Sequence, residues 1–214
     1  MRVARVPATL AAPREIGIFA LGTVLVPGEL MPLHIFEPRY RELIGDCERD
    51  QVPFLLLFTD DEGTREVGCT AQLVEVVERF DDGRMNVVVE GRDVVKVVQI
   101  TRGRGYTTAV VEPAPDDLSA EGDQEAALDL YRQIAEAGGG DPQEDLLASA
   151  RPLSYAIMSR VEFPSDEKQR LLELRSERER LTGVTELLAR GLQALEAMAK
   201  VRERAHTNGK VDRG

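Results

Sequence analysis

The chain of 214 residues contains no tryptophan, only two cysteines and only two histidines. Cys47 and Cys69 lie far apart and form no CxxC pair, which argues against a disulfide framework and against a structural zinc site. Their scarcity fits two buried thiols in a reducing cytoplasm. With His34 and His206 as its only histidines, the sequence offers no histidine cluster for a metal, and we expect no cofactor.

Several common motifs and segments are also missing. The sequence has no P-loop of the form GxxxxGK[ST], no GxSxG, no HExxH and no GxGxxG behind a strand, so the commonest motif-borne reactions lack their parts. No segment approaches the ~20 apolar residues of a membrane span, and the N-terminus lacks the apolar run of a signal peptide. The sequence therefore predicts a cytoplasmic protein, with a flexible leader over residues 1–13 and a flexible tail over 206–214.

Positive charge is in short supply. The formal net charge is -11, and residues 112–145 alone hold eleven acidic residues against one basic residue. A chain this acidic is poorly suited to neutralising nucleic-acid phosphates. The parts on either side of that segment are closer to neutral, so an RNA-binding basic face stays open as an alternative, with these arginines as its candidates: Arg84, Arg92, Arg102 and Arg104.

What the sequence does contain, up to residue 113, is mostly valine and isoleucine broken by glycine, aspartate and proline, which is typical of a β domain. Asp82-Gly83 between two apolar runs predicts a hairpin with a type I′ turn, which needs positive φ at both central residues. We expect strands over 16–21, 30–35, 54–59, 67–80, 84–91, 94–101 and 106–112.

One helix interrupts these strands. Over residues 38–50, apolar side chains recur at steps of three and four after a proline at the first helical position. Beyond Pro113 and Pro115 the apolar period becomes helical. We expect helices over 124–137, over 146–161 with a break at Pro152, and over 177–204, with N-caps at Asp141 and Ser176. The sequence therefore predicts an α+β protein, with a β domain over 14–113 and an α-helical bundle over 114–205.

The stretch MPLHIFEPRY, residues 31–40, draws attention because it holds the one histidine outside the tail. An enzyme using Glu37 with His34 or Cys47 is a weak hypothesis, because the sequence shows no clustered nucleophile, base and orienting group. We interpret Glu37, Pro38, Arg39 and Tyr40 as a structural corner, since a carboxylate at a helix N-terminus is stabilised by unpaired N–H groups. Phe36 and Tyr40 are expected to pack beneath this turn.

This stretch belongs to a longer similarity. The segment FALGTVLVPGELMPLHIFEPRYRELI, residues 19–44, resembles the N-terminal, substrate-binding domain of Lon proteases, also found as stand-alone proteins. The resemblance continues with VGCT at 67–70, DGRMNV at 82–87, EGR at 90–92 and DEKQRLLE at 166–173, and it covers roughly residues 16–200. One departure is Ala20, which stands where family members often have a proline.

The resemblance implies a compact, PUA-like β domain followed by an α-helical bundle. It also implies a non-catalytic module that binds unfolded or tagged polypeptides and works with a protease or chaperone. A full Lon protease would add an ATPase with a P-loop and a peptidase with a Ser-Lys dyad, and we expect neither activity here. We place the contact around Pro32, His34 and Phe36 and the groove towards the bundle. Self-association through the apolar stripe of the last helix is compatible with this role.

Overall fold

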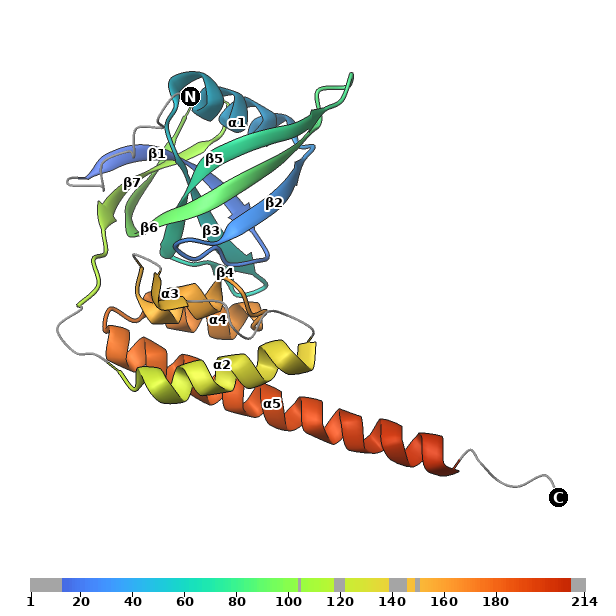
Figure 1. Cartoon of the computed structure of the whole chain (residues 1–214). Coiled ribbons are helices and arrows are strands. Elements are labelled where there is room, and N and C mark those ends of the chain that lie inside the picture. Colours follow the sequence, from blue (N-terminus) through green and yellow to red (C-terminus); the bar gives the residue numbers. More distant parts are fainter. Residues whose placement is uncertain (1–12, 104, 118–121, 139–145, 149–150, 209–214) are drawn as a thin grey trace.

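The computed structural model describes residues 13–103, 105–117, 122–138, 146–148 and 151–208. Its strands form a closed barrel above a group of helices (Figure 1). Neighbouring strands follow the order β1, β7, β6, β5, β3, and β1 closes the ring by pairing in parallel with β3. The α+β prediction is confirmed. The barrel strands are β1 (Arg14–Leu21), β3 (Phe54–Asp60), β5 (Val67–Arg79), β6 (Met85–Arg102) and β7 (Thr107–Pro113).

Three smaller elements complete this part. Strand β2 (Leu30–Ile35) pairs antiparallel with the first part of β6, and β4 (Gly63–Thr64) pairs with β3. Helix α1 (Pro38–Asp50) caps the upper end of the barrel (Figure 1). Its bounds are those predicted, and the side chains that it buries are those of the predicted face: Tyr40, Leu43, Ile44 and Cys47.

Strand β6 corrects one prediction, because the two strands expected over 84–91 and 94–101 are one strand of 18 residues. Gly91, which the sequence analysis placed at the end of the strand over 84–91, lies inside β6. It donates its N–H to the Glu29 carbonyl at 2.9 Å, and an added Cβ would collide with the carbonyl of Val26. Glycine is required there for a close approach between backbones and not for a turn.

The hairpin between β5 and β6 is present, but its turn is not type I′. Gly83 has φ of 84°, whereas Asp82 is not among the described residues with positive φ. The N–H of Gly83 donates to the Phe80 carbonyl at 2.9 Å, and the N–H of Phe80 donates to the Arg84 carbonyl at 2.9 Å. These bonds define a three-residue loop with a type I turn followed by a left-handed glycine, so Asp81 belongs to the loop.

Bulges interrupt the alternation of β5 and β6. The pairing register shifts between Leu73 and Glu75, between Val76 and Glu78, and between Val97 and Gln99. Each shift inserts one valine that has no partner in the register. These valines are Val74, Val77 and Val98, and their side chains are 53%, 59% and 58% exposed.

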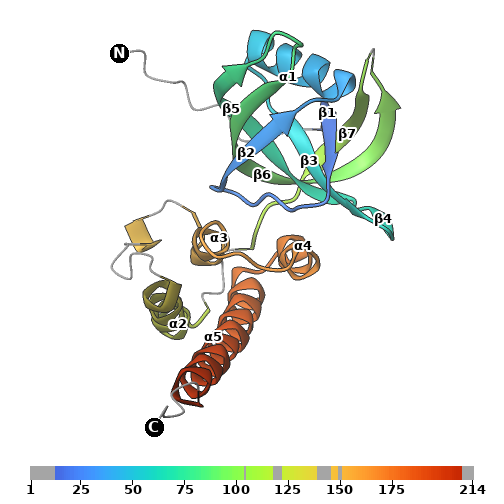
Figure 2. The ribbon, with the colours of Figure 1, turned by 90° about the vertical axis from the view of Figure 1, so that its right-hand side faces the viewer.

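Below the barrel lie α2 (Gln124–Gly138), α3 (Leu153–Met158), α4 (Ser165–Glu173) and α5 (Glu177–Asn208), with a 3₁₀ turn at Leu146–Ala148 (Figures 1 and 2). The break at Pro152 is confirmed, because Pro152 is the N-cap residue of α3, which begins at Leu153. Helix α5 extends well beyond the other helices and reaches Asn208, so residues 206–208, predicted as part of a flexible tail, are helical. The N-cap predicted at Asp141 lies outside the described residues.

Barrel and helices share an apolar cluster. Val26 and Phe58 from the barrel part pack in the same buried cluster as Leu171 of α4 and Leu188 of α5. Two polar contacts join the same parts: Lys168 binds the Glu29 carboxylate at 2.7 Å, and Gln169 donates to the Val67 carbonyl at 3.0 Å. None of the described helices is long and apolar enough to cross a membrane.

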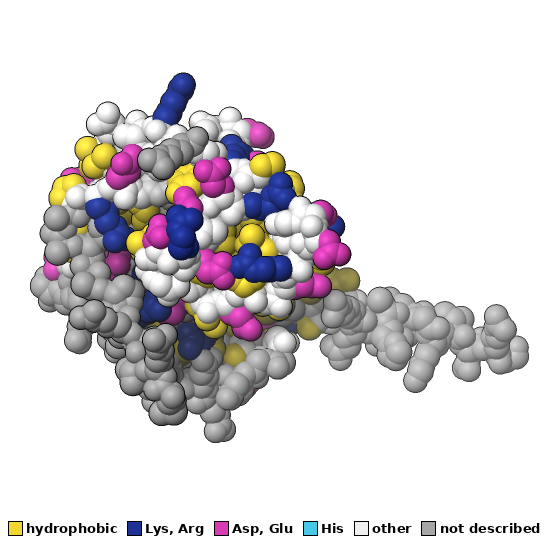
Figure 3. Space-filling model, turned by 90° about the horizontal axis from the view of Figure 1, so that it is seen from above, with side chains coloured by type: hydrophobic (Ala, Val, Ile, Leu, Met, Phe, Trp, Pro, Cys, Tyr) yellow, Lys and Arg dark blue, Asp and Glu magenta, His cyan; other side chains and the backbone are white. Residues whose placement is uncertain are grey.

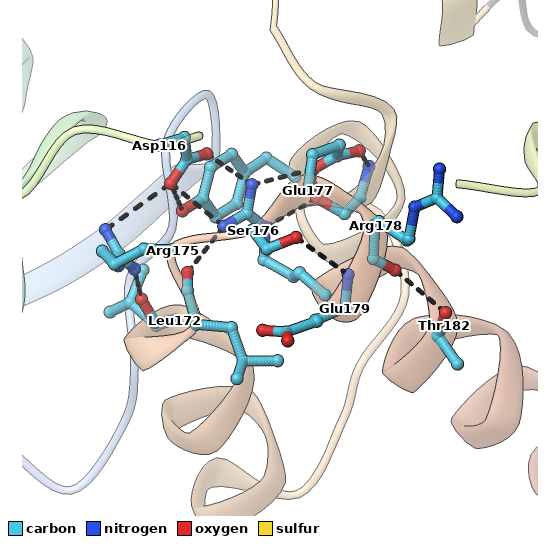
Figure 4. Close-up of polar contacts among 12 residues, drawn as sticks. Asp116, Leu172, Arg175, Ser176, Glu177, Arg178, Glu179 and Thr182 are labelled. Carbon is cyan, nitrogen blue, oxygen red and sulfur yellow. Dashed lines mark hydrogen bonds and ion pairs between the residues drawn. The ribbon is translucent and has the colours of Figure 1, made fainter. Parts of the chain in front are cut away.

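A buried ionic network fixes the start of α5 (Figure 4). The fully buried Arg180 side chain bonds the Asp116 carboxylate, donates to Glu177 at 2.8 Å and donates to the Ser154 hydroxyl at 2.7 Å. The predicted N-cap at Ser176 is confirmed, because its hydroxyl accepts the N–H of Glu179 at 3.4 Å. This network ties the segment after β7 to both α3 and α5.

Candidate functional site

The outer face of β2 carries the residues that the sequence singled out. Leu33 and Ile35 are buried in the barrel, whereas Pro32 and His34 point outward, because successive side chains of a strand alternate between its faces. Phe36, just after the strand, is 59% exposed. The expectation that Phe36 packs beneath the turn is therefore wrong, although its exposure suits a contact surface.

His34 of β2 lies at one end of a small polar chain that crosses β6 and ends on β5. Its Nδ1 lies 2.7 Å from Oδ1 of Asn86, and the Asn86 amide donates to the Glu78 carboxylate at 3.1 Å. Since an amide oxygen only accepts, Nδ1 carries the proton. The imidazole ring lies 6.0 Å from the ring of Phe36 and 6.1 Å from that of Phe80, between centroids. These contacts orient the exposed His34 side chain beside Phe36 and Phe80.

The Glu37–Tyr40 residues form the entry to α1. Glu37 is the N-cap residue, but its carboxylate binds Arg39 at 2.8 Å and makes no side-chain capping bond. Pro38 opens the helix. Tyr40 packs beneath the turn as expected, with its ring centroid 4.0 Å from that of Phe19 and its hydroxyl donating to the Ala20 carbonyl at 3.3 Å. These four residues lie together, next to Phe36.

The second edge of β2 is open. Strand β2 pairs only with β6 among the described strands. Pro32 lacks an N–H, and a proline inside a sheet turns its nitrogen away from the neighbouring strand. Because backbone groups alternate in direction along a strand, the N–H groups of Leu30 and His34 face the same open side. This edge therefore offers backbone donors and acceptors that an added strand could pair with.

A groove of about 480 Å³ lies beside this part of β2. We call it the β2 groove. One wall is formed by Leu21 and Pro32, and the other by Met158 and Phe163 from the helices. It lies between β2 and the helices, where the sequence analysis placed the contact, and its use as a binding site stays a prediction. Pro32 lines it, whereas His34 and Phe36 are not among its lining residues and continue the exposed face beyond it.

A second groove of about 500 Å³ lies among the helices, and we call it the α5 groove. Its lining is mainly apolar and includes Ile134 of α2, Phe163 before α4, and Leu195 and Met198 of α5. Gly191 leaves room there, since an added Cβ would have the Ile134 side chain at 3.9 Å as its nearest neighbour. Leu195 and Met198 are 40% and 61% exposed, so this end of the predicted helical stripe is uncovered.

The contacts described for Glu37, His34 and Cys47 do not support the catalytic hypothesis. Cys47 is buried on the inner face of α1, and burial raises the pKa of its thiol to about 12, which disfavours the thiolate. The side chain of His34 bonds Asn86, and that of Glu37 bonds Arg39. The described contacts thus do not join these three side chains. Among the described residues no group of three or more histidine, cysteine, aspartate or glutamate side chains could hold a metal.

The three described arginines of the candidate basic face, Arg84, Arg92 and Arg102, do not lie together. Arg84 precedes β6, Arg92 lies near its middle and Arg102 is its last residue, so the length of the strand separates them. Arg84 binds Asp82 at 2.7 Å and Arg92 binds Glu90 at 2.8 Å. Arg104 lies outside the described residues. Viewed from above, basic and acidic side chains are interspersed on the visible face (Figure 3), which does not favour phosphate binding there.

The sequence analysis did not single out the groove residues Met158, Val161 and Phe163. The only local signal was an aromatic residue beside Pro164, between two helical segments. A groove assembled from residues more than 100 positions apart requires the tertiary structure, and no local pattern reveals it.

The described residues thus combine a closed barrel, an open edge of β2 and two adjoining grooves. The family model for the ATP-dependent protease La (LON) substrate-binding domain matches residues 15–190, and the chain belongs to this family. The predicted resemblance is thereby confirmed.

Relatives and solved structures agree with this assignment. The chain is 25% identical over 209 residues to Lon protease 2 of Syntrophobacter fumaroxidans, covering 90% of this chain and 26% of that protein. It is 28% identical over 217 residues to Lon protease 1 of Herpetosiphon aurantiacus, covering 91% and 26%. The chain thus spans about a quarter of the length of these curated relatives.

The solved structures support the fold. A Lon N-terminal domain protein from Xanthomonas campestris has a TM-score of 0.61 at 24% identity, and the N-terminal domain of a Mycobacterium avium complex Lon protease has a TM-score of 0.62 at 18% identity. Each match covers 82% of this chain and 98% of the other.

Proposed function

We propose that the chain is a non-catalytic module that binds unfolded or tagged polypeptide segments and presents them to a protease or chaperone. Membership of the Lon substrate-binding family supports a substrate-binding role. The observation that carries the proposal is the open edge of β2, with a groove on that side and the exposed Pro32, His34 and Phe36 on its outer face.

The binding mode follows from the strand edge. An extended segment can add to β2 through main-chain hydrogen bonds, which do not depend on sequence, while its alternate side chains enter the β2 groove. A folded protein has its backbone already paired and cannot bind in this way. The module therefore distinguishes unfolded from folded chains by their unpaired backbone.

Equilibrium binding to a fluorescent, permanently unfolded polypeptide tests the proposal, at two salt concentrations and with a folded protein and a short RNA as controls. We expect saturable binding of the unfolded chain that survives high salt, because apolar contacts and backbone bonds are screened little. Binding of RNA that falls steeply with salt, without binding of the unfolded chain, would instead favour the RNA-binding alternative.

Surface variants locate the contact. Phe36→Ser and Leu30→Ser change side chains that are 59% and 62% exposed, so both proteins should fold normally. If these side chains become buried under the bound chain, each change should weaken binding by about tenfold. Val52→Ser, at a 42% exposed residue beyond the end of α1, is the matched control and should bind as the unaltered protein does. Equal affinities for all four proteins would refute the proposed location.

A further inference from the structure

The β2 groove and the α5 groove meet. Val161, Glu162 and Phe163, in the connection between α3 and α4, line both of them. With about 480 Å³ on one side of this connection and about 500 Å³ on the other, a ligand that fills one groove lies next to the other. A segment that ends at the β2 groove would leave the adjoining apolar surface of α5 exposed.

Each charged side chain that lines the two grooves has a bonding partner, except one carboxylate at their junction that has none among the described residues. In the β2 groove Lys168 binds Glu29 at 2.7 Å, and in the α5 groove Arg190 binds Glu167 at 3.0 Å. Arg160 bonds the Ala156 carbonyl and the Ser159 hydroxyl. Glu162 is exposed and makes no ion pair or hydrogen bond with any described residue. At the junction, the Glu162 carboxylate is therefore available to a bound ligand, whereas the Arg160 side chain is held at the end of α3.

We propose that one extended polypeptide occupies both grooves, and that the module prefers segments in which a single Arg or Lys separates two apolar stretches. The inference rests on the proposed function. The apolar stretches lie against Leu21 and Pro32 on one side and Leu195 and Met198 on the other, and the basic side chain meets Glu162 between them. Charge complementarity at Glu162 sets the position of the segment, while the apolar contacts supply most of the affinity.

Three synthetic peptides of about 16 residues test the preference, identical except for a central Arg, Gln or Glu between two apolar halves. An exposed ion pair is worth about 0.2–1 kcal/mol, so the Arg peptide should bind roughly 1.4- to fivefold more tightly than the Gln peptide. The Glu162→Gln protein should lose this difference, and the Glu162→Lys protein should prefer the Glu peptide. Glu186→Gln, which removes an exposed carboxylate of α5 that has no partner among the described residues and lies outside both grooves, should keep the original order.

Occupancy of the α5 groove is tested separately. Gly191→Leu fills that groove and favours the helix, so the protein should stay folded. We expect it to bind the 16-residue Arg peptide about tenfold more weakly, and to bind a half-length peptide directed to the β2 groove as the unaltered protein does. Unchanged binding of the long peptide, or a dimer that Gly191→Leu abolishes, would show a different occupant and overturn the inference.

The two proposals fail in different ways. If no unfolded polypeptide binds, the proposed function fails. If unfolded polypeptides bind but all three peptides bind equally to the unaltered protein and to the Glu162 variants, only the preference for a central basic residue is wrong.

Discussion

The guanidinium carbon of Arg180 lies 3.8 Å from the centre of the Tyr155 ring. Arg180 is fully buried and Tyr155 is 3% exposed, so a cation and an aromatic face meet where water is excluded. Burial also raises the pKa of Tyr155, which keeps its hydroxyl neutral beside the carboxylate of Asp116. The fold therefore maintains a charged group in its interior by surrounding it with matched partners.

Arg180→Met should lower the free energy of unfolding by about 3–5 kcal/mol, because Asp116 and Glu177 would be left with their charges buried and without this cation. Denaturant unfolding measures the change. Arg178→Met removes an exposed arginine of the same helix and should stay within about 0.5 kcal/mol of the unaltered protein. An Arg180→Met protein as stable as the control would show that the network contributes little.

Two glycines of α5 should respond in opposite ways to alanine. Gly191→Ala meets only ordinary contact at 3.9 Å and should stabilise the protein by up to about 1 kcal/mol through helix propensity. Gly183→Ala would place its methyl group 2.5 Å from Cδ2 of Leu171 and should destabilise the protein by about 1–3 kcal/mol. Thermal unfolding of the two variants side by side checks the signs, and changes of equal sign would contradict this account of α5 packing.

Both cysteines should be unreactive in the folded protein. Burial raises the pKa of Cys47 to about 12 and raises that of Cys69 as well, so neither thiol ionises near pH 8, and neither is accessible. An aromatic disulfide reagent should titrate no thiol rapidly in native buffer and two thiols in denaturant. Rapid reaction of one thiol without denaturant would show that its part of the barrel opens locally.

Glu15 should make the protein sensitive to acid. Hydrogen bonds from Thr101 at 2.7 Å and Thr108 at 2.9 Å hold the pKa of this carboxyl below its usual 4.5. A lowered pKa in the folded state stabilises the fold fully above the unfolded pKa, and this stabilisation is lost as pH falls through the folded value. The stability difference between the unaltered protein and Glu15→Gln should therefore be constant near neutral pH and shrink below about pH 4.5. A difference that does not depend on pH would exclude this role.

The division into parts 14–113 and 114–205 stays a prediction, and the shared apolar cluster gives it a test. Val26 and Phe58 would become exposed if the helices separated from the barrel. We therefore expect both parts to unfold in one transition, with equal calorimetric and van't Hoff enthalpies. Two resolved transitions would show that the boundary separates independently stable units.

Local patterns in the sequence predicted the elements that local forces determine. Helix α1 has the predicted ends because Pro38 opens it and because its apolar side chains recur at helical spacing. The Asp82-Gly83 hairpin was found for the same reason, although three-residue and two-residue loops share this sequence signal. The order of the strands within the barrel had no such signal.

The surface was harder to predict. Val74, Val77 and Val98 are apolar residues inside predicted strands, and register shifts in the pairing with other strands turn them outward. The exposure of Phe36 had no local signal either. The sequence did point to Pro32 and to the groove beside the bundle, because that stretch carries the family resemblance. It did not show that a second groove adjoins the first, with Phe163 lining both grooves and Met198 lining the α5 groove.

The closure of the barrel has a consequence for how the chain folds. Residue Arg14 of β1 pairs with Val111 of β7, so the first strand completes one of its edges only when nearly half of the chain has followed it. Contacts between such distant residues are slow to form, because the loop between them must lose entropy before any pairing compensates. During synthesis, β1 would have its parallel partner β3 first and its antiparallel partner β7 much later. Barrel closure is therefore expected to limit the folding rate, and strand edges stay accessible to chaperones until it is complete.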